Sequence, residues 1–128
     1  MIEDNPADVG LVREALDEHG VVCELTVVTD GERAIQFIEE LDEQCRWCPD
    51  LVILDLKLPK REGHHVLERI RVSTQCPDVP IVILTSSDAK EDRDRAVKLG
   101  ATRYIRKPDR LHDFILLGAV FKEILAGR

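Results

Sequence analysis

The sequence has few aromatic residues, few cysteines and fewer basic than acidic residues. Aromatic residues make up 4% of the 128 residues, and 18 Lys and Arg face 25 Asp and Glu, which gives a formal net charge of −7. Because negative charge repels phosphate backbones and anionic lipids, we expect neither nucleic acid nor a membrane as a direct partner. No apolar run approaches the roughly 18 residues of a membrane helix. The start does not resemble a signal peptide, so we expect a soluble, cytoplasmic protein.

The few cysteines do not define a disulfide framework or a zinc site. Cys45 and Cys48 form a CxxC pair, but no second pair follows at the spacing of a structural zinc site, and only the scattered Cys23 and Cys76 remain. A thioredoxin-type pair opens a helix after a strand, whereas this pair follows a helical stretch. We therefore expect reduced thiols that pack around Trp47. A domain of this length also needs no disulfide to fold.

Short strand-like runs alternate with helical patterns along the chain. The strand-like runs are residues 22–28, 51–54, 81–84 and 101–105. Helical spacing of apolar residues predicts helices over residues 6–20, 31–43, 64–73, 89–99 and 109–126. Right-handed crossovers between parallel strands place helices on both faces of a sheet, so the alternation predicts an α/β fold with a parallel sheet. We find no internal repeat or linker, and residues 1–128 are expected to form a single domain.

Polar residues stand where the apolar runs end. Asp55 and Thr85 each directly follow such a run, Lys107 follows the last one, and Glu3-Asp4 precede the first helix. Ligands of open parallel sheets bind beyond the carboxyl ends of the strands, so these side chains are expected in one cleft. Carboxylates that converge repel each other by about 1–4 kcal/mol per close pair, and Mg²⁺ relieves this repulsion. The set favours phosphoryl transfer to an aspartate.

Several longer motifs surround these residues. They are Glu3-Asp4-Asn5, Leu51-Val52-Ile53-Leu54-Asp55-Leu56-Lys57-Leu58-Pro59, Gly63, Ile83-Leu84-Thr85-Ser86 and Lys107-Pro108. Over these motifs, and over essentially its whole length, the chain resembles the receiver domain of two-component response regulators. The runs Asp4-Asn5-Pro6-Ala7-Asp8 and Leu58-Pro59-Lys60 are most similar to the stand-alone subgroup that includes partners of bacterial phytochrome kinases.

The resemblance implies a flavodoxin-like, doubly wound sheet of five parallel strands in the order 2-1-3-4-5. It implies that Asp55 accepts a phosphoryl group from a phosphohistidine on a sensor histidine kinase, a bacterial phytochrome being one candidate. Glu3, Asp4, Asp55 and the main-chain carbonyl of Lys57 would hold Mg²⁺. Lys107 and Thr85 would stabilise charge on the transferring group.

The resemblance further implies a conformational switch. Thr85 would move toward the phosphoryl group and Tyr104 would rotate inward, which changes the surface of the fourth helix, fifth strand and fifth helix. A downstream protein, a phosphotransfer partner or a second copy of the chain would bind there. The bond before Pro108 would be cis. The chain would act as a signalling protein, not as an enzyme, and without an output domain.

The chain departs from the receiver pattern at its first strand, since only Met1 and Ile2 precede the acidic pair. Either residues upstream of Met1 are missing from this sequence, or the fold has a truncated or missing first strand. Two alternatives stay open. One is a pseudo-receiver that binds partners without being phosphorylated. The other is an aspartyl-phosphate hydrolase, although such enzymes resemble one another in a second Asp two positions after the nucleophile, where this chain has Lys57.

Overall fold

The computed structural model describes residues 1–45 and 47–127. The helices are α1 (Pro6–Glu18), α2 (Gly31–Gln44), α3 (Gly63–Arg71), α4 (Lys90–Lys98) and α5 (Leu111–Ala126). The strands are β1 (Val52–Leu54), β2 (Ile81–Thr85) and β3 (Arg103–Arg106). Each helix that the sequence predicts is present, and the α/β class is confirmed. Within the described residues, none of the helices combines the length and the apolar character needed to cross a membrane.

The first two helices begin at side chains that cap their free amide groups. Asn5 Oδ1 accepts a hydrogen bond of 3.0 Å from the N–H of Ala7, and Pro6 occupies the first helical position. Asp30 Oδ1 accepts a bond of 2.7 Å from the N–H of Arg33. Because α1 starts at Pro6, the acidic residues just before it are held at the point where the chain leaves the sheet.

The sheet has three parallel strands in the order β1-β2-β3, with Leu54 opposite Ile83 and Ile83 opposite Tyr104. All residues of β1 and β2 are buried, as expected for strands that are covered on both faces. Ile2 adds single parallel bridges to Val28 on one side and to Leu54 on the other. The spatial order therefore agrees with the predicted order 2-1-3-4-5, with Val28 and Ile2 in the places of the second and first strands.

The prediction of a full strand over residues 22–28 is wrong, because only Val28 pairs. The reason is the short first strand. Parallel pairing needs a neighbour along the whole length of a strand, and only the segment from Met1 to Glu3 is available to residues 26–28. Val22 is fully exposed, at 100% of its surface. The first and second strands of the expected sheet are thus represented by the isolated bridges of Ile2.

A cavity of about 700 Å³ lies where the first strand would continue. We call it the strand gap, and its walls include residues 21–26 on one side and 48–53 on the other. The Met1 amino group lies at its end and donates a hydrogen bond of 2.7 Å to the carbonyl of Thr26. This bond is the one that a peptide N–H of a continuing parallel strand would make, because the N–H of Glu3 bonds to Val28 in the same way, at 2.9 Å.

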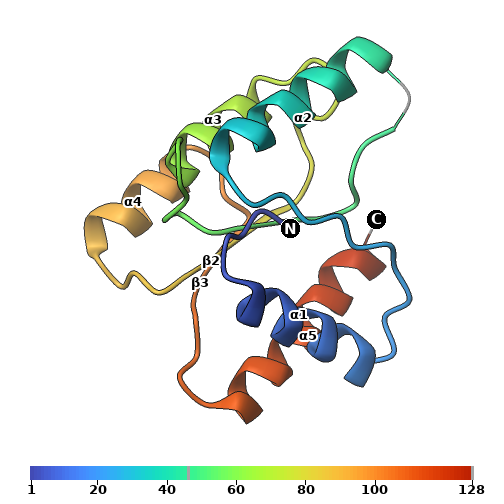
Figure 1. Ribbon diagram of the computed structural model, residues 1–128, viewed down its shortest axis with the longest axis vertical. Helices are drawn as coiled ribbons and strands as arrows, with labels where there is room; N and C mark the ends of the chain where they lie inside the picture. The colour runs from blue at the N-terminus through green and yellow to red at the C-terminus, as the bar shows by residue number, and fades with distance from the viewer. Residues whose placement is uncertain (46, 128) are drawn as a thin grey trace.

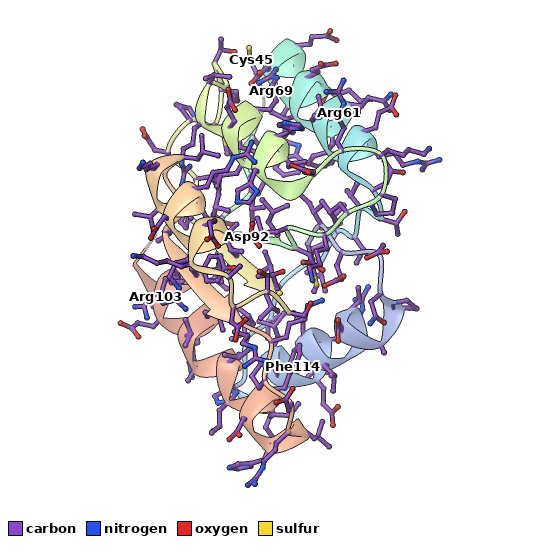
Figure 2. All side chains as sticks on the ribbon, turned by 90° about the vertical axis from the view of Figure 1, so that its left-hand side faces the viewer. Cys45, Arg61, Arg69, Asp92, Arg103 and Phe114 are labelled. Atoms are coloured by element: carbon purple, nitrogen blue, oxygen red, sulfur yellow. A yellow bond between two sulfur atoms is a disulfide. The ribbon has the colours of Figure 1, made fainter. Side chains whose placement is uncertain are left out.

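Helices cover both faces of the sheet (Figure 1). Helices α1 and α5 lie together on one face, and their core residues are Val12, Leu16, Phe114 and Phe121. Helices α2, α3 and α4 cover the other face, with a core that includes Ile38, Leu67, Ile70 and Ala96. Figure 2 shows Phe114 in the α1–α5 layer and Arg69 in the α2–α3 layer. Two separate cores therefore hold the sheet rigidly between them.

The cysteines and one proline differ from expectation. Cys48 and Cys76 form a disulfide with their Cα atoms 5.6 Å apart, so the prediction of reduced thiols is wrong for this pair. The loops after α2 and α3 bring together residues that are 28 positions apart, which sequence spacing does not reveal. The prediction of a cis bond before Pro108 is also wrong, since the described peptide bonds include no cis bond. Trans is the isomer that X–Pro bonds favour intrinsically.

Candidate functional site

Asp55 is positioned by the backbone around the end of β1. Its N–H donates to the carbonyl of Ile2 at 3.1 Å, and its carboxylate Oδ1 accepts from the N–H of Lys57 at 3.1 Å. Gly63 passes so close that an added Cβ would lie 2.3 Å from the carbonyl oxygen of Asp55. Asp55 is 5% exposed. The carboxylate is thus fixed at the carboxyl end of the strand.

Three carboxylates meet at this end of the strand. Glu3, Asp4 and Asp55 each offer an oxygen, and these oxygens all lie within 4.8 Å of one another. Glu3 is only 1% exposed, whereas Asp4 is exposed. Burial, followed by the negative charge of Asp55, raises the pKa of Glu3 to about 7 against the opposing effect of Lys107. The site therefore holds more negative charge than its protein groups neutralise at neutral pH.

Lys107 supplies the positive charge of the site. Its Nζ lies 2.7 Å from Asp8 Oδ2, 2.8 Å from Glu3 Oε1 and 3.0 Å from Asp55 Oδ2. Its backbone is fixed by a hydrogen bond of 2.7 Å from its N–H to the carbonyl of Thr85. Burial alone would lower the pKa of the ammonium group, but its bonds to the three carboxylates outweigh burial and raise the pKa above its ordinary value.

One oxygen of the cluster remains without a hydrogen bond. Glu3 Oε1 is buried and faces Lys107 as an ion pair, yet it accepts no hydrogen bond of good geometry among the described residues. A buried carboxylate oxygen that keeps a free lone pair, next to two further carboxylates, matches the hard oxygen donors that Mg²⁺ and Mn²⁺ take. The residues present thus fit a divalent cation.

Thr85 and Tyr104 are linked to each other through Ser87. Thr85 ends β2, is fully buried, and its Oγ1 accepts a long hydrogen bond of 3.4 Å from the N–H of Ser87. The Tyr104 hydroxyl donates to the carbonyl of Ser87 at 3.0 Å, and Ser87 Oγ donates to Asp92 of α4 at 2.5 Å. Figure 2 shows Asp92 on α4. The loop after β2 is thus fastened to both β3 and α4.

The structure brings most of the predicted site residues together. Glu3, Asp4, Asp55 and Lys107 form one cluster, and Thr85 adjoins it through the backbone of Lys107. Tyr104 is not part of the cluster and is hydrogen-bonded to Ser87 in the loop after β2. The N–H of Lys57 bonds Asp55, and the metal-binding role of its carbonyl remains a prediction.

Sequence reasoning missed Asp8. It lies in the first turn of α1, where an acidic residue is common because it complements the helix dipole. Its partner Lys107 is 99 positions away in sequence. The only available signal was that Asp8 stands one helical turn beyond the acidic pair, which points it toward the same end of the sheet.

The α/β fold carries an acidic cluster at the carboxyl ends of its strands, and comparison with known proteins identifies its family. Residues 1–116 match the model of the response regulator receiver domain, and the chain belongs to this family. It is 33% identical over 114 residues to response regulator Rcp1 of Synechocystis, covering 88% of this chain and 78% of that protein.

Solved structures agree with this family. The phosphorylated cyanobacterial phytochrome response regulator RcpA has a TM-score of 0.86 and 32% identity, with 98% of this chain and 90% of that chain covered. The Mn²⁺-bound form of Rcp1 has a TM-score of 0.84 and 31% identity, with 95% of this chain and 88% of that chain covered. Receiver domains bind a divalent metal, work with histidine kinases and act as signalling switches rather than as enzymes.

Proposed function

We propose that this chain accepts a phosphoryl group on Asp55 from a phosphohistidine of a sensor histidine kinase, in a Mg²⁺-dependent reaction. The observation that carries the proposal is the placement of the Asp55 carboxylate. Its Oδ2 lies 3.0 Å from Lys107 Nζ, and one of its oxygens lies within 4.8 Å of one oxygen of Glu3 and one of Asp4. A nucleophile, a set of oxygens that fits a cation and an ammonium group thus lie together at one site.

The transfer is a simple exchange of bonds. The P–N bond of the phosphohistidine breaks, a P–O bond to an Asp55 oxygen forms, and the released imidazole takes up a proton. Glu3, Asp4, Asp55 and the Lys57 carbonyl would hold Mg²⁺, which when bound offsets the negative charge of the phosphoryl oxygens. Lys107 would donate hydrogen bonds to those oxygens from its ammonium group, and Thr85 from its hydroxyl.

The conformational response is proposed to pass through the loop after β2. Thr85 and Tyr104 are both hydrogen-bonded to Ser87. A shift of Thr85 toward the phosphoryl group would therefore disturb the Ser87 carbonyl, to which the Tyr104 hydroxyl donates. The output surface would be that of α4, β3 and α5, and it would bind a downstream protein, a phosphotransfer partner or a second copy. Similarity to Rcp1 and to the phytochrome regulator RcpA supports a bacterial phytochrome as the kinase.

The test is intact-mass measurement after incubation with phosphoramidate, with and without Mg²⁺. We expect one added phosphoryl group that requires Mg²⁺ and is absent in Asp55→Asn. Asp50→Asn is the matched control, because it makes the same charge change at an exposed residue just before β1. An adduct that persists in Asp55→Asn would place the acceptor elsewhere.

The second candidate is a pseudo-receiver, which would bind partners without being phosphorylated. In that case the folded protein takes up no phosphoryl group at any Mg²⁺ concentration. The same mass measurement therefore separates the two functions.

A further inference from the structure

Asp8 makes the shortest contact of the Lys107 ammonium group. The distance from Asp8 Oδ2 to Lys107 Nζ is 2.7 Å. Both side chains are largely shielded from water, with 16% of Asp8 and 14% of Lys107 exposed. Ion pairs on an open surface contribute little, but shielding makes this pair stronger than such pairs and less sensitive to salt. The contact is therefore a built part of the site.

The three carboxylates around Lys107 are not equivalent. Glu3 and Asp55 also belong to the group of oxygens that fits a divalent cation, whereas Asp8 does not. A cation and the ammonium group would compete for the oxygens of Glu3 and Asp55. Asp8 is the one partner that Lys107 can keep when the cation is bound.

Both ends of the Asp8–Lys107 pair are held in place. The backbone of Lys107 is bonded to Thr85, and Asp8 is fixed in a helix that packs tightly on α5, where Gly118 closely approaches the Ala15 carbonyl. The ammonium group stands on the flexible four-carbon stem of the lysine side chain. It contacts all three carboxylates in this structure and can shift toward Asp8 without any movement of the backbone.

We propose that Asp8 is a positioning residue, which keeps the Lys107 ammonium group when a cation takes up the oxygens of Glu3 and Asp55 and so leaves it ready to contact a phosphoryl oxygen on Asp55. The phosphoryl part of this inference rests on the proposed function, whereas the part about cation binding does not. Without the Asp8 charge, Glu3 and Asp55 are the carboxylates left to the ammonium group, which then competes directly with the cation for their oxygens.

The test is a double-mutant cycle on Mn²⁺ affinity, measured by calorimetry in Asp8→Asn, Lys107→Ala and the double variant. We expect Asp8→Asn to weaken Mn²⁺ binding by roughly tenfold, since a shielded charged hydrogen bond is lost. With Lys107 already replaced, the same change should cost no more than about twofold, through the general loss of negative charge. Equal factors in both backgrounds, or absence of Mn²⁺ binding by the native chain, would overturn the proposal.

Two further variants exclude a merely structural effect. Asp17→Asn makes the same charge change at an exposed position of α1 and should leave Mn²⁺ affinity unchanged. Asp8→Glu keeps the charge and should restore most of the affinity. If Asp17→Asn weakened Mn²⁺ binding as much as Asp8→Asn does, Asp8 would not act through Lys107.

Phosphorylation by phosphoramidate separates this inference from the proposed function. Asp8→Asn should slow the uptake of the phosphoryl group by roughly tenfold at saturating Mg²⁺, with recovery in Asp8→Glu. If the native chain takes up no phosphoryl group but the Mn²⁺ cycle shows coupling, the proposed function fails and the role of Asp8 toward the cation stands. If the native chain is phosphorylated but the cycle shows no coupling, the role of Asp8 fails alone.

Discussion

The Nζ atom of Lys107 lies 2.8 Å from Oε1 of Glu3, a residue of which only 1% is exposed. Despite this close positive charge, the pKa of Glu3 rises to about 7, because burial of the carboxylate raises the pKa more than the hydrogen bond and charge of Lys107 lower it. Lys107 also forms ion pairs with Asp8 and Asp55 at the same time. The site is thus left short of positive charge, which a divalent cation would supply.

The first prediction concerns the pH dependence of stability without metal. The pKa of Glu3 rises from 4.5 to about 7 on folding, so the folded state binds this proton more tightly than the unfolded state. The resulting stabilisation is complete below pH 4.5 and is lost as the pH rises to about 7. We expect the free energy of unfolding to fall by ~3 kcal/mol across this window in urea titrations.

Glu3→Gln is the control for this prediction, because glutamine does not titrate. The difference in unfolding free energy between the two proteins should change across the window and stay constant above it. Saturating Mn²⁺ should move the window to lower pH, since the cation binds the deprotonated carboxylate. Parallel pH profiles for both proteins would contradict a titrating Glu3.

The second prediction concerns Gly63, which closes the loop behind Asp55. A Cβ at this position would lie 2.3 Å from the Asp55 carbonyl oxygen and 2.6 Å from Leu56 Cα, both of which are backbone atoms. Gly63→Ala must therefore displace the loop that carries the acceptor. We expect a loss of about 2–4 kcal/mol in urea unfolding together with weaker Mn²⁺ binding.

Gly10→Ala is the matched control for Gly63→Ala. Gly10 lies inside α1, and a Cβ there would meet nothing within 4 Å. Because alanine is the better helix former, this change should stabilise the protein by up to about 1 kcal/mol. If the Gly63→Ala protein were as stable as the native chain, the loop could shift freely. That outcome would contradict the tight packing around Asp55.

Much of the fold and of the site could be predicted because the signals are local. The apolar runs that end at Asp55 and Thr85 are strands covered on both faces, and their carboxyl ends coincide by the geometry of parallel sheets. The contacts of Asp8 and of Cys76 could not be predicted, because they join loops or helices that meet only through tertiary packing. Residues 22–27 are rich in β-branched residues, which predicts a strand, but they form none because no strand lies beside them to pair with.

The third prediction concerns Asp42, which ties the end of α2 to the turn after α3. Its Oδ1 accepts hydrogen bonds from Ser73 Oγ at 2.5 Å and from the N–H of Gln75 at 3.1 Å, and its Oδ2 accepts from Arg69 Nη2 at 2.8 Å. Figure 2 shows Arg69 at this end of α3. Asp42→Ala leaves the hydroxyl, amide and guanidinium groups without their acceptor, and we expect a loss of about 2 kcal/mol at pH 7.

Acid should remove the advantage of Asp42. The Ser73 hydrogen bond, with smaller help from Arg69 and Gln75, lowers the pKa of Asp42 from 3.8 to about 2. The stabilisation is thus present above pH 3.8 and is lost as the pH falls toward 2. Glu43→Gln, at an exposed neighbouring position, should show neither the loss at pH 7 nor the acid dependence. Thermal unfolding of the variants at pH 7 and pH 3 measures both.

The fourth prediction concerns the strand gap. The carbonyl of Ile53 accepts a hydrogen bond from the N–H of Ile2, so it points toward the first strand. Because the N–H and C=O of one strand residue point to the same side, the N–H of Ile53 faces the strand gap. The N–H of Thr26 faces it from the other wall and has no backbone partner among the described residues. An extended segment fused ahead of Met1 would meet both donors in parallel register, with apolar walls on its two faces.

We therefore expect a fusion of about five alternating Val and Ile residues ahead of Met1 to raise the free energy of unfolding by a few kcal/mol. Each fully buried side chain contributes about 1.5–3 kcal/mol, and ordering each residue costs about 1–2 kcal/mol. A Gly-Ser fusion of equal length is the control, because it offers peptide groups without apolar side chains.

Hydrogen exchange should show new protection at the amides of Thr26 and Ile53 in the apolar fusion alone. Mn²⁺ affinity should rise with it, because Glu3 and Asp4 then follow a strand that is paired along its length. Equal stability of the two fusions would mean that the gap closes by collapse of its own walls, and the acidic pair would then gain nothing from a longer strand.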